Sequence, residues 1–115
     1  MNTIYLACPY SYNPNKSFDI ANKVAAIFMK DGNVVFSPVS HSHKIADYME
    51  KEVRFSQSFW LEQDLKFMDV CDKLIIISIG KDGKKLIKES KGCQSEIQKA
   101  MKLNLPINYY KYEEK

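Results

Sequence analysis

The stretch KLIIISI, residues 73–79, decides the fold because apolar side chains occupy consecutive positions in it. A strand exposed on one face alternates apolar and polar residues, whereas a continuous apolar run suits a strand covered on both faces, as in a parallel sheet. Three further strand-like runs are TIYLA at 3–7, NVVFSPV at 33–39 and LPINYY at 105–110. We therefore expect a parallel sheet with helices on both of its faces.

Apolar residues recur at helical spacing between these runs. The expected helices follow Asn13 or Asn15 and end at Gly32, cover residues 56–72, and run from about Gly92 to Leu103, with a polar, partly helical segment at 40–55. In the last helix we expect Cys93, Ile97, Ala100 and Met101 to point inward. We interpret residues 80–90 as a charged loop and residues 111–115 as a tail.

The resulting order, β-α-β-α-α-β-α-β, predicts an α/β fold. We expect one domain over residues 1–115, built as a three-layer sandwich around a parallel, flavodoxin/Rossmann-like sheet of four to five strands. Ligands of such sheets bind beyond the carboxyl ends of the strands. That rule selects CPYSYN at 8–13, PVSHSH at 38–43 and GKDGKKLIKESKG at 80–92.

Composition restricts the class of ligand. Seventeen basic residues against fourteen acidic ones give a net charge of +3, which suits a phosphorylated small molecule and falls short of a nucleic-acid-binding surface. The three cysteines form no C-x-x-C motif, so we expect a reduced, cytoplasmic protein. No apolar stretch approaches the roughly 20 residues that cross a membrane, and the N-terminus does not have the pattern of a signal peptide.

Glu96, near the start of the last expected helix, has two interpretations. An acid there can simply complement the helix dipole. Alternatively, the adjoining Ser90 and Gly92 offer an anion cradle at a helix N-terminus, and a carboxylate held there is a competent nucleophile for a sugar carbon.

Asp64 is the candidate partner acid, because cleavage at an anomeric carbon commonly uses two carboxyl groups. It lies one helical turn from Trp60, which could raise its pKa by partial burial. The alternative is a solvated acid on a helix face. Asp72, between a helix and a strand, is interpreted as a structural turn residue.

His41 and His43 are either surface loop residues or contacts to a phosphate. A zinc site needs three or four protein ligands, and no third ligand stands at a suitable spacing, so we expect no metal. Tyr5, Tyr10 and Trp60 are candidates to flank a base.

The chain resembles the nucleoside 2-deoxyribosyltransferase-like superfamily in three segments: IYLACPYS at 4–11, EQDLKFMDVCDKLIIISI at 62–79 and SKGCQSEIQKA at 90–100. SPVSHSH at 37–43 further suggests its small, uncharacterised bacterial and phage branch. The resemblance implies that Glu96 is a nucleophile, that Asp64 contacts the sugar and aids proton transfer, and that Tyr5 orients Glu96. It also implies a phosphate site at Ser90 and Gly92, and a base and sugar site at Cys8, Pro9, Tyr10 and Ser11.

We therefore expect an N-glycosidase or deoxyribosyltransferase that acts on a nucleotide or nucleoside without a cofactor. A signalling nucleotide such as a cyclic dinucleotide belongs to this class of substrate. The resemblance implies a homo-oligomer. The alternative is a non-catalytic protein that sequesters or senses a nucleotide. A phosphoribohydrolase is disfavoured because its PGGxGT loop is absent from the sequence.

Overall fold

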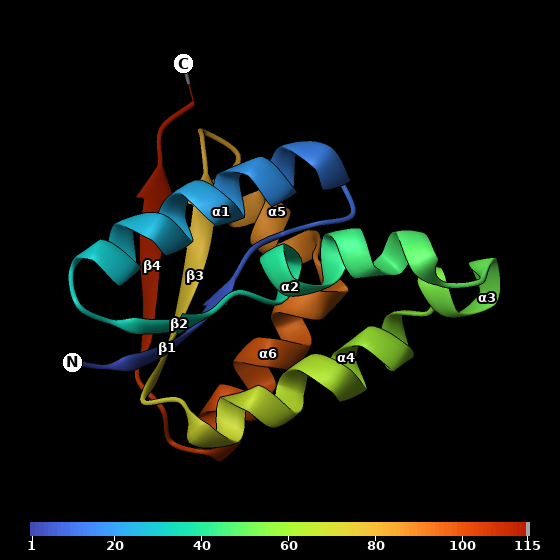
Figure 1. The fold of residues 1–115 in the computed structure, drawn as a ribbon. Coiled ribbons are helices and arrows are strands. Elements are labelled where there is room, and N and C mark those ends of the chain that lie inside the picture. Colours follow the sequence, from blue (N-terminus) through green and yellow to red (C-terminus); the bar gives the residue numbers. More distant parts are fainter. Residues whose placement is uncertain (115) are drawn as a thin grey trace.

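The computed structural model describes residues 1–114. Its sheet has four parallel strands in the order β2-β1-β3-β4, with β1 and β3 at the centre (Figure 1). The strands are β1 (Thr3–Ala7), β2 (Val34–Phe36), β3 (Lys73–Ile79) and β4 (Ile107–Tyr112). The parallel α/β fold predicted from the continuous apolar run is confirmed.

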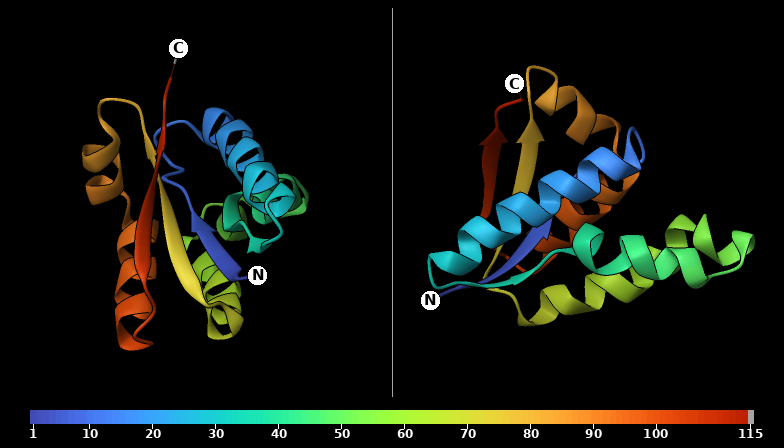
Figure 2. Two further views of the ribbon diagram at one scale, coloured as in Figure 1. Left: turned by 90° about the vertical axis from the view of Figure 1, so that its left-hand side faces the viewer. Right: turned by 45° about the horizontal axis from the view of Figure 1, so that its top comes forward.

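The two central strands send alternate side chains to opposite faces of the sheet. Ile4 and Leu6 join a core with α1 (Pro14–Lys30), while Tyr5 and Ala7 join a second core that includes residues of α6 (Lys91–Lys102). Figure 2 shows α1 on one side of the β3–β4 pair and α6 on the other. The molecule therefore has the three layers that the sequence predicts.

The ends of α1 follow the predicted signals. The side chain of Asn13 accepts a hydrogen bond from the backbone N–H of Lys16, and Pro14 opens the helix, where the missing N–H of proline carries no penalty. Gly32 follows the helix at φ +92°, a conformation that side-chain-bearing residues rarely adopt. The turn into β2 therefore requires this glycine.

A mostly helical segment connects β2 to β3. It contains α2 (Pro38–Ile45), the short 3-10 helix η1 (Ala46–Tyr48), α3 (Lys51–Arg54), α4 (Gln57–Leu65) and the 3-10 helix η2 (Lys66–Val70). Figure 1 shows that the segment runs out from the sheet to α3 and returns along α4. At its end Asp72 and Thr3 exchange two bonds, since each backbone N–H donates to an oxygen of the other residue at 2.7 Å. The structural role predicted for Asp72 is confirmed.

Residues 80–90 were wrongly predicted to be a loop, because they contain the helix α5 (Gly83–Glu89). Two apolar residues, Leu86 and Ile87, pack against the cores of the sheet and hold the helix in place. Gly83 allows the close approach, since a Cβ atom there would lie 2.0 Å from the hydroxyl oxygen of Ser78. The sequence signal is weak because charged residues surround the two apolar positions.

Three smaller expectations also fail. Pro38 and Val39 were placed in the strand-like run at 33–39 but belong to α2, because Ser37 caps the helix and Pro38 opens it. Met101 was expected to point inward but is 64% exposed. The last strand was expected to end at Tyr110, but β4 continues to Tyr112. Within residues 1–114, no helix has the length and apolarity to cross a membrane.

Candidate active site

Four side chains from four elements meet on the α6 side of the sheet: Tyr5 from β1, Ser42 from α2, Asp64 from α4 and Glu96 from α6. Tyr5 is fully buried, and Asp64 and Glu96 are only 7% and 6% exposed. Asp64 is the one buried residue of α4. Carboxyl groups are rarely buried to this extent unless they are paired, so both acids are more than solvated helix-face residues.

The contact between α4 and α6 brings the two acids together. One face of α6 presents Gly92, Glu96 and Lys99, which are three or four residues apart. Gly92 lies beside the side-chain amide of Gln57 near the start of α4, and the ammonium group of Lys99 donates to the carbonyl oxygen of Leu65 at 2.5 Å. Glu96 lies between these two contacts, close enough to Asp64 for the charge of Asp64 to raise its pKa.

Burial shifts both carboxyl groups towards the protonated form. Burial raises the pKa of Glu96 to about 8, the Tyr5 hydroxyl lowers it, and the charge of Asp64 raises it further. Burial also raises the pKa of Asp64 to about 7, against the effect of the Ser42 hydroxyl, which lies 3.4 Å from its Oδ1 and lowers the pKa. Both carboxyl groups therefore keep their protons to a higher pH than exposed carboxyl groups do.

The Tyr5 hydroxyl is an available donor beside this pair. It has no hydrogen-bond partner within residues 1–114, although it is close enough to Glu96 for each group to shift the other's pKa. Burial, followed by the charge of Glu96, raises the pKa of Tyr5 far above its ordinary value. The hydroxyl therefore keeps its proton at every physiological pH.

Ser17, a residue that sequence reasoning missed, fixes the loop after β1. The buried hydroxyl of Ser17 donates to the carbonyl oxygen of Pro9 at 2.6 Å. Cys8 and Pro9 are buried, while Ser11 is exposed. Burial raises the pKa of the Cys8 thiol to about 12, so Cys8 is a packed thiol and not a reactive one.

Tyr10 and His43, which the sequence places in different candidate segments, are in direct contact. The Tyr10 hydroxyl lies 2.6 Å from Nδ1 of His43, and the imidazole ring stacks on Phe18. Burial lowers the pKa of His43, which favours the neutral ring as an acceptor. His41 points elsewhere, towards Phe36 and Phe67. The structure therefore does not bring the two histidines together.

The remaining predicted residues lie around the start of α6 and on α4. Ser90 caps α6 by accepting a hydrogen bond from the backbone N–H of Cys93 at 3.1 Å. Gly92, in the first turn of α6, has no side chain to cover the backbone N–H groups there. Trp60 donates its indole N–H to the carbonyl oxygen of Arg54 and packs against Phe59.

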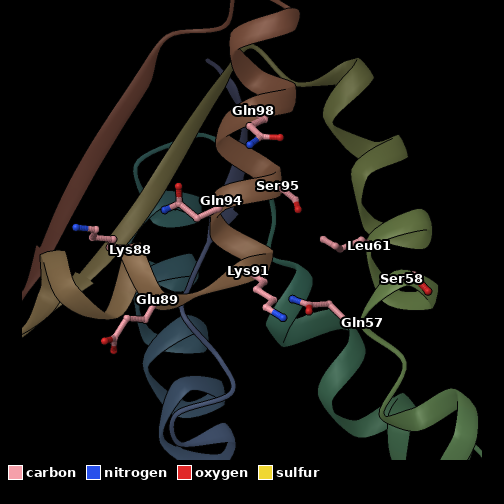
Figure 3. A pocket seen from close by; sticks show the side chains of 9 residues that line it. All are labelled: Gln57, Ser58, Leu61, Lys88, Glu89, Lys91, Gln94, Ser95 and Gln98. Carbon is pink, nitrogen blue, oxygen red and sulfur yellow. The ribbon is translucent and has the colours of Figure 1, made fainter.

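A surface cleft of about 590 Å³ opens between α4 and α6. Figure 3 shows Leu61 and Ser95 on its two sides, with Gln57 and Lys91 at the end where α6 begins. Neither Glu96 nor Asp64 lines this cleft. The charge of Asp64 reaches Glu96, but both acids lie behind the surface and not in this cleft.

Ser42 and Lys99 are two further site residues that sequence reasoning missed. Ser42 belongs to a polar segment without an apolar period, and Lys99 resembles any basic residue near a helix end, so neither carries a local signal. Within residues 1–114, no group of three or more histidine, cysteine, aspartate and glutamate side chains is arranged to hold a metal ion.

Comparison with known proteins supports the fold. The structure is similar to the solved 2-desoxiribosyltransferase from Leishmania mexicana, with a TM-score of 0.62 and 18% identity over 96% of this chain. The chain spans 65% of that protein, less than two thirds of its length. At this identity the likeness shows the fold alone, and it confirms the fold that the sequence resemblance implied.

The chain matches none of the curated proteins. The model of a protein family described as Domain of unknown function (DUF1937) matches residues 2–112, which is nearly the whole chain. The chain therefore belongs to the DUF1937 family.

Proposed function

We propose that this protein cleaves the N-glycosidic bond of a nucleotide or nucleoside, with Glu96 as nucleophile and Asp64 as the acid. The observation that carries the proposal is the buried Glu96–Asp64 pair beside a Tyr5 hydroxyl without a partner. Buried carboxyl groups and an unpaired hydroxyl lower stability. A bound substrate could supply the contacts that these groups lack, which would explain why they are kept at this cost in stability. The fold is similar to that of a deoxyribosyltransferase, whose name implies a reaction at the same kind of bond.

In the proposed first step, a carboxylate oxygen of Glu96 attacks C1′ of the sugar and the bond from C1′ to the base nitrogen breaks. The electron pair of that bond stays on the base, which takes a proton from the Asp64 carboxyl group. A glycosyl ester of Glu96 results. Water then attacks C1′ and gives a proton to the Asp64 carboxylate, which frees the sugar and restores Glu96. A second base in place of water gives transfer.

This division of roles requires a proton on Asp64 and a carboxylate at Glu96. Burial raises the pKa of both carboxyl groups, which favours a protonated acid at this site. Donation by the Tyr5 hydroxyl to Glu96 stabilises the Glu96 carboxylate. We infer that substrate binding completes this hydrogen bond, so that the proton stays on Asp64, next to the departing base.

A nucleotide fits better than a nucleoside. Ser90 and Gly92 stand in the first turn of α6, where backbone N–H groups and the helix dipole favour an anion, and Lys91 adds a positive charge there. A 5′-phosphate at this point would place the sugar towards Glu96, about one helical turn further on. A cyclic dinucleotide or another signalling nucleotide belongs to the same class.

We also propose that the protein forms a homo-oligomer in which a second copy covers the site, and that it is located in the cytoplasm.

One observation favours a second candidate function, which is nucleotide binding without turnover. The two acids are nearly inaccessible, and neither of the two surface hollows described for this molecule is lined by them. A protein that sequesters a nucleotide needs the anion contacts of α6 but no access to Glu96.

A base-release screen separates the two functions. Wild-type protein, Glu96→Gln and a control Glu62→Gln, which makes the same change on the exposed surface of α4, are incubated with nucleosides, nucleoside monophosphates and cyclic nucleotides. Free base is measured by chromatography and binding by calorimetry. The proposal expects release by wild type and control, and loss of at least about a thousandfold in Glu96→Gln. Binding without release would establish the second function.

A further inference from the structure

A second hollow lies between α5, α6 and the edge strand β4, on the α6 side of the sheet. We call it the lysine hollow and define it by six of its lining residues: Ser78, Lys84, Lys88, Gln94, Tyr109 and Lys111. Its volume of about 550 Å³ is typical of small-molecule sites. Within residues 1–114, β4 pairs with β3 only, so the hollow is bordered by an edge of the sheet.

Three ammonium groups surround this hollow, and no acidic side chain lines it. Lys84 and Lys88 are four residues apart and share one face of α5, while Lys111 approaches from β4. None of the three forms an ion pair within the described part of the chain. Like charges at this spacing repel one another, and a bound anion would remove that repulsion.

The other side chains suit an aromatic ring with polar edges. Tyr109 is 58% exposed on the sheet face, so its ring is free to stack. The amide nitrogen of Gln94 donates to the carbonyl oxygen of Ile87 at 3.0 Å, which fixes the side chain. The amide oxygen of Gln94 accepts no hydrogen bond within residues 1–114 and remains available to an amino group.

The lysine hollow is separate from the Glu96–Asp64 pair. Gln94 and Ile97 line it from α6 and, being three residues apart, share one face of that helix. Glu96 lies on another face, which packs towards α4. The hollow shares Lys88 and Gln94 with the cleft between α4 and α6, but neither Glu96 nor Asp64 lines it.

We propose that the lysine hollow binds a phosphorylated aromatic small molecule of the nucleoside phosphate class. The phosphate oxygens accept charge-assisted hydrogen bonds from the lysines, the base stacks on Tyr109, and its amino group donates to Gln94. This inference does not depend on the proposed glycosidase activity, since none of its contacts involves Glu96.

The test is a titration followed by the backbone amide NMR signals of Tyr109 and Lys111, with ADP, adenosine and inorganic pyrophosphate at constant ionic strength. We expect ADP to shift these signals at lower concentration than either of the other compounds. Equal binding of adenosine and ADP, or no shift with ADP, would overturn the proposal.

Variants assign the contacts. Lys84→Gln/Lys111→Gln should weaken ADP binding at least about tenfold, whereas the control Lys30→Gln/Lys51→Gln removes the same charge elsewhere and should not. Tyr109→Ala should weaken ADP binding but spare pyrophosphate binding. Equal losses in the lysine pair and the control pair would contradict the proposal. All exchanged lysines are exposed, and dispersed spectra verify that each variant is folded.

Discussion

The carboxyl group of Glu96 lies beside the hydroxyl group of Tyr5, and that hydroxyl is completely buried without a hydrogen-bond partner within residues 1–114. A buried, unsatisfied hydroxyl lowers stability by about 1–3 kcal/mol. The Tyr5 hydroxyl, which lowers the stability of the fold, therefore lies next to Glu96, the acid that we propose as the nucleophile.

Tyr5→Phe tests this link directly. Removing the unpartnered hydroxyl should leave the free energy of unfolding unchanged or raise it by about 1 kcal/mol, while base release falls about a hundredfold because Glu96 loses its orienting donor. Urea denaturation and initial rates measure the two effects. A less stable variant with unchanged turnover would show that the hydroxyl serves the fold and not the reaction.

Asp64→Asn removes the proposed acid but keeps its shape. Base release should fall at least about a hundredfold, and the fall in rate at high pH should disappear, because that limb reports the loss of the Asp64 proton. Rates from pH 5 to 9 measure both, with Glu62→Gln as the control. An unaltered high-pH limb would assign the proton to another group.

The raised pKa values predict how stability depends on pH. The folded protein holds protons on Asp64 and Glu96 up to about pH 7 and 8, whereas the unfolded chain loses them near pH 4. The native state thus binds more protons in this interval, and the free energy of unfolding falls as pH rises from about 4 to 8. Asp64→Asn/Glu96→Gln should flatten this decline. Urea denaturation at several pH values checks it, and an equal slope in the double variant would contradict the burial argument.

Ser42 is predicted to tune Asp64. Because its hydroxyl lowers the pKa of Asp64, Ser42→Ala should raise that pKa and move the high-pH limb of the rate profile upwards, while Ser42→Thr keeps the hydroxyl and the original limb. The carboxyl carbon signal of Asp64 in NMR reports the same shift without substrate. Identical titrations in both variants would exclude this role.

Lys99 is predicted to hold α4 against α6. Its ammonium group contacts the carbonyl oxygen of Leu65 and, at 2.9 Å, the carboxylate of Asp69. Lys99→Met should lower the free energy of unfolding by about 1–3 kcal/mol, whereas Lys102→Met, an exposed change one turn further along α6, should alter it by less than about 0.5 kcal/mol. Thermal unfolding compares the two variants, and similar values would remove Lys99 from the helix contact.

Sequence reasoning succeeded where the signal was local and apolar. The continuous run at 73–79 predicted the central strand and, with it, the parallel sheet, and the Asn13 and Gly32 signals placed the ends of α1. It failed at α5, where only Leu86 and Ile87 distinguish a helix from a charged loop. Short, charged helices depend on contacts to the sheet, which the local pattern does not contain.

The site was predictable only in part, for a similar reason. Asp64 and Glu96 were candidates because of their positions. The local sequence does not distinguish a buried acid from an exposed one, because their burial depends on how α4 packs on α6. Ser42 contacts Asp64 across 22 residues of chain, and Lys99 contacts Leu65 across 34. Such contacts depend on how the helices pack and leave no periodic mark.

The most direct test of the central claim is mass spectrometry of the protein quenched in acid during turnover of a substrate identified by base release. The account predicts a peptide that contains Glu96 and carries the mass of the bound sugar, and it predicts no such adduct in Glu96→Gln. A sugar attached to Asp64, or steady turnover without any protein-bound sugar, would contradict the assignment of Glu96 as the nucleophile.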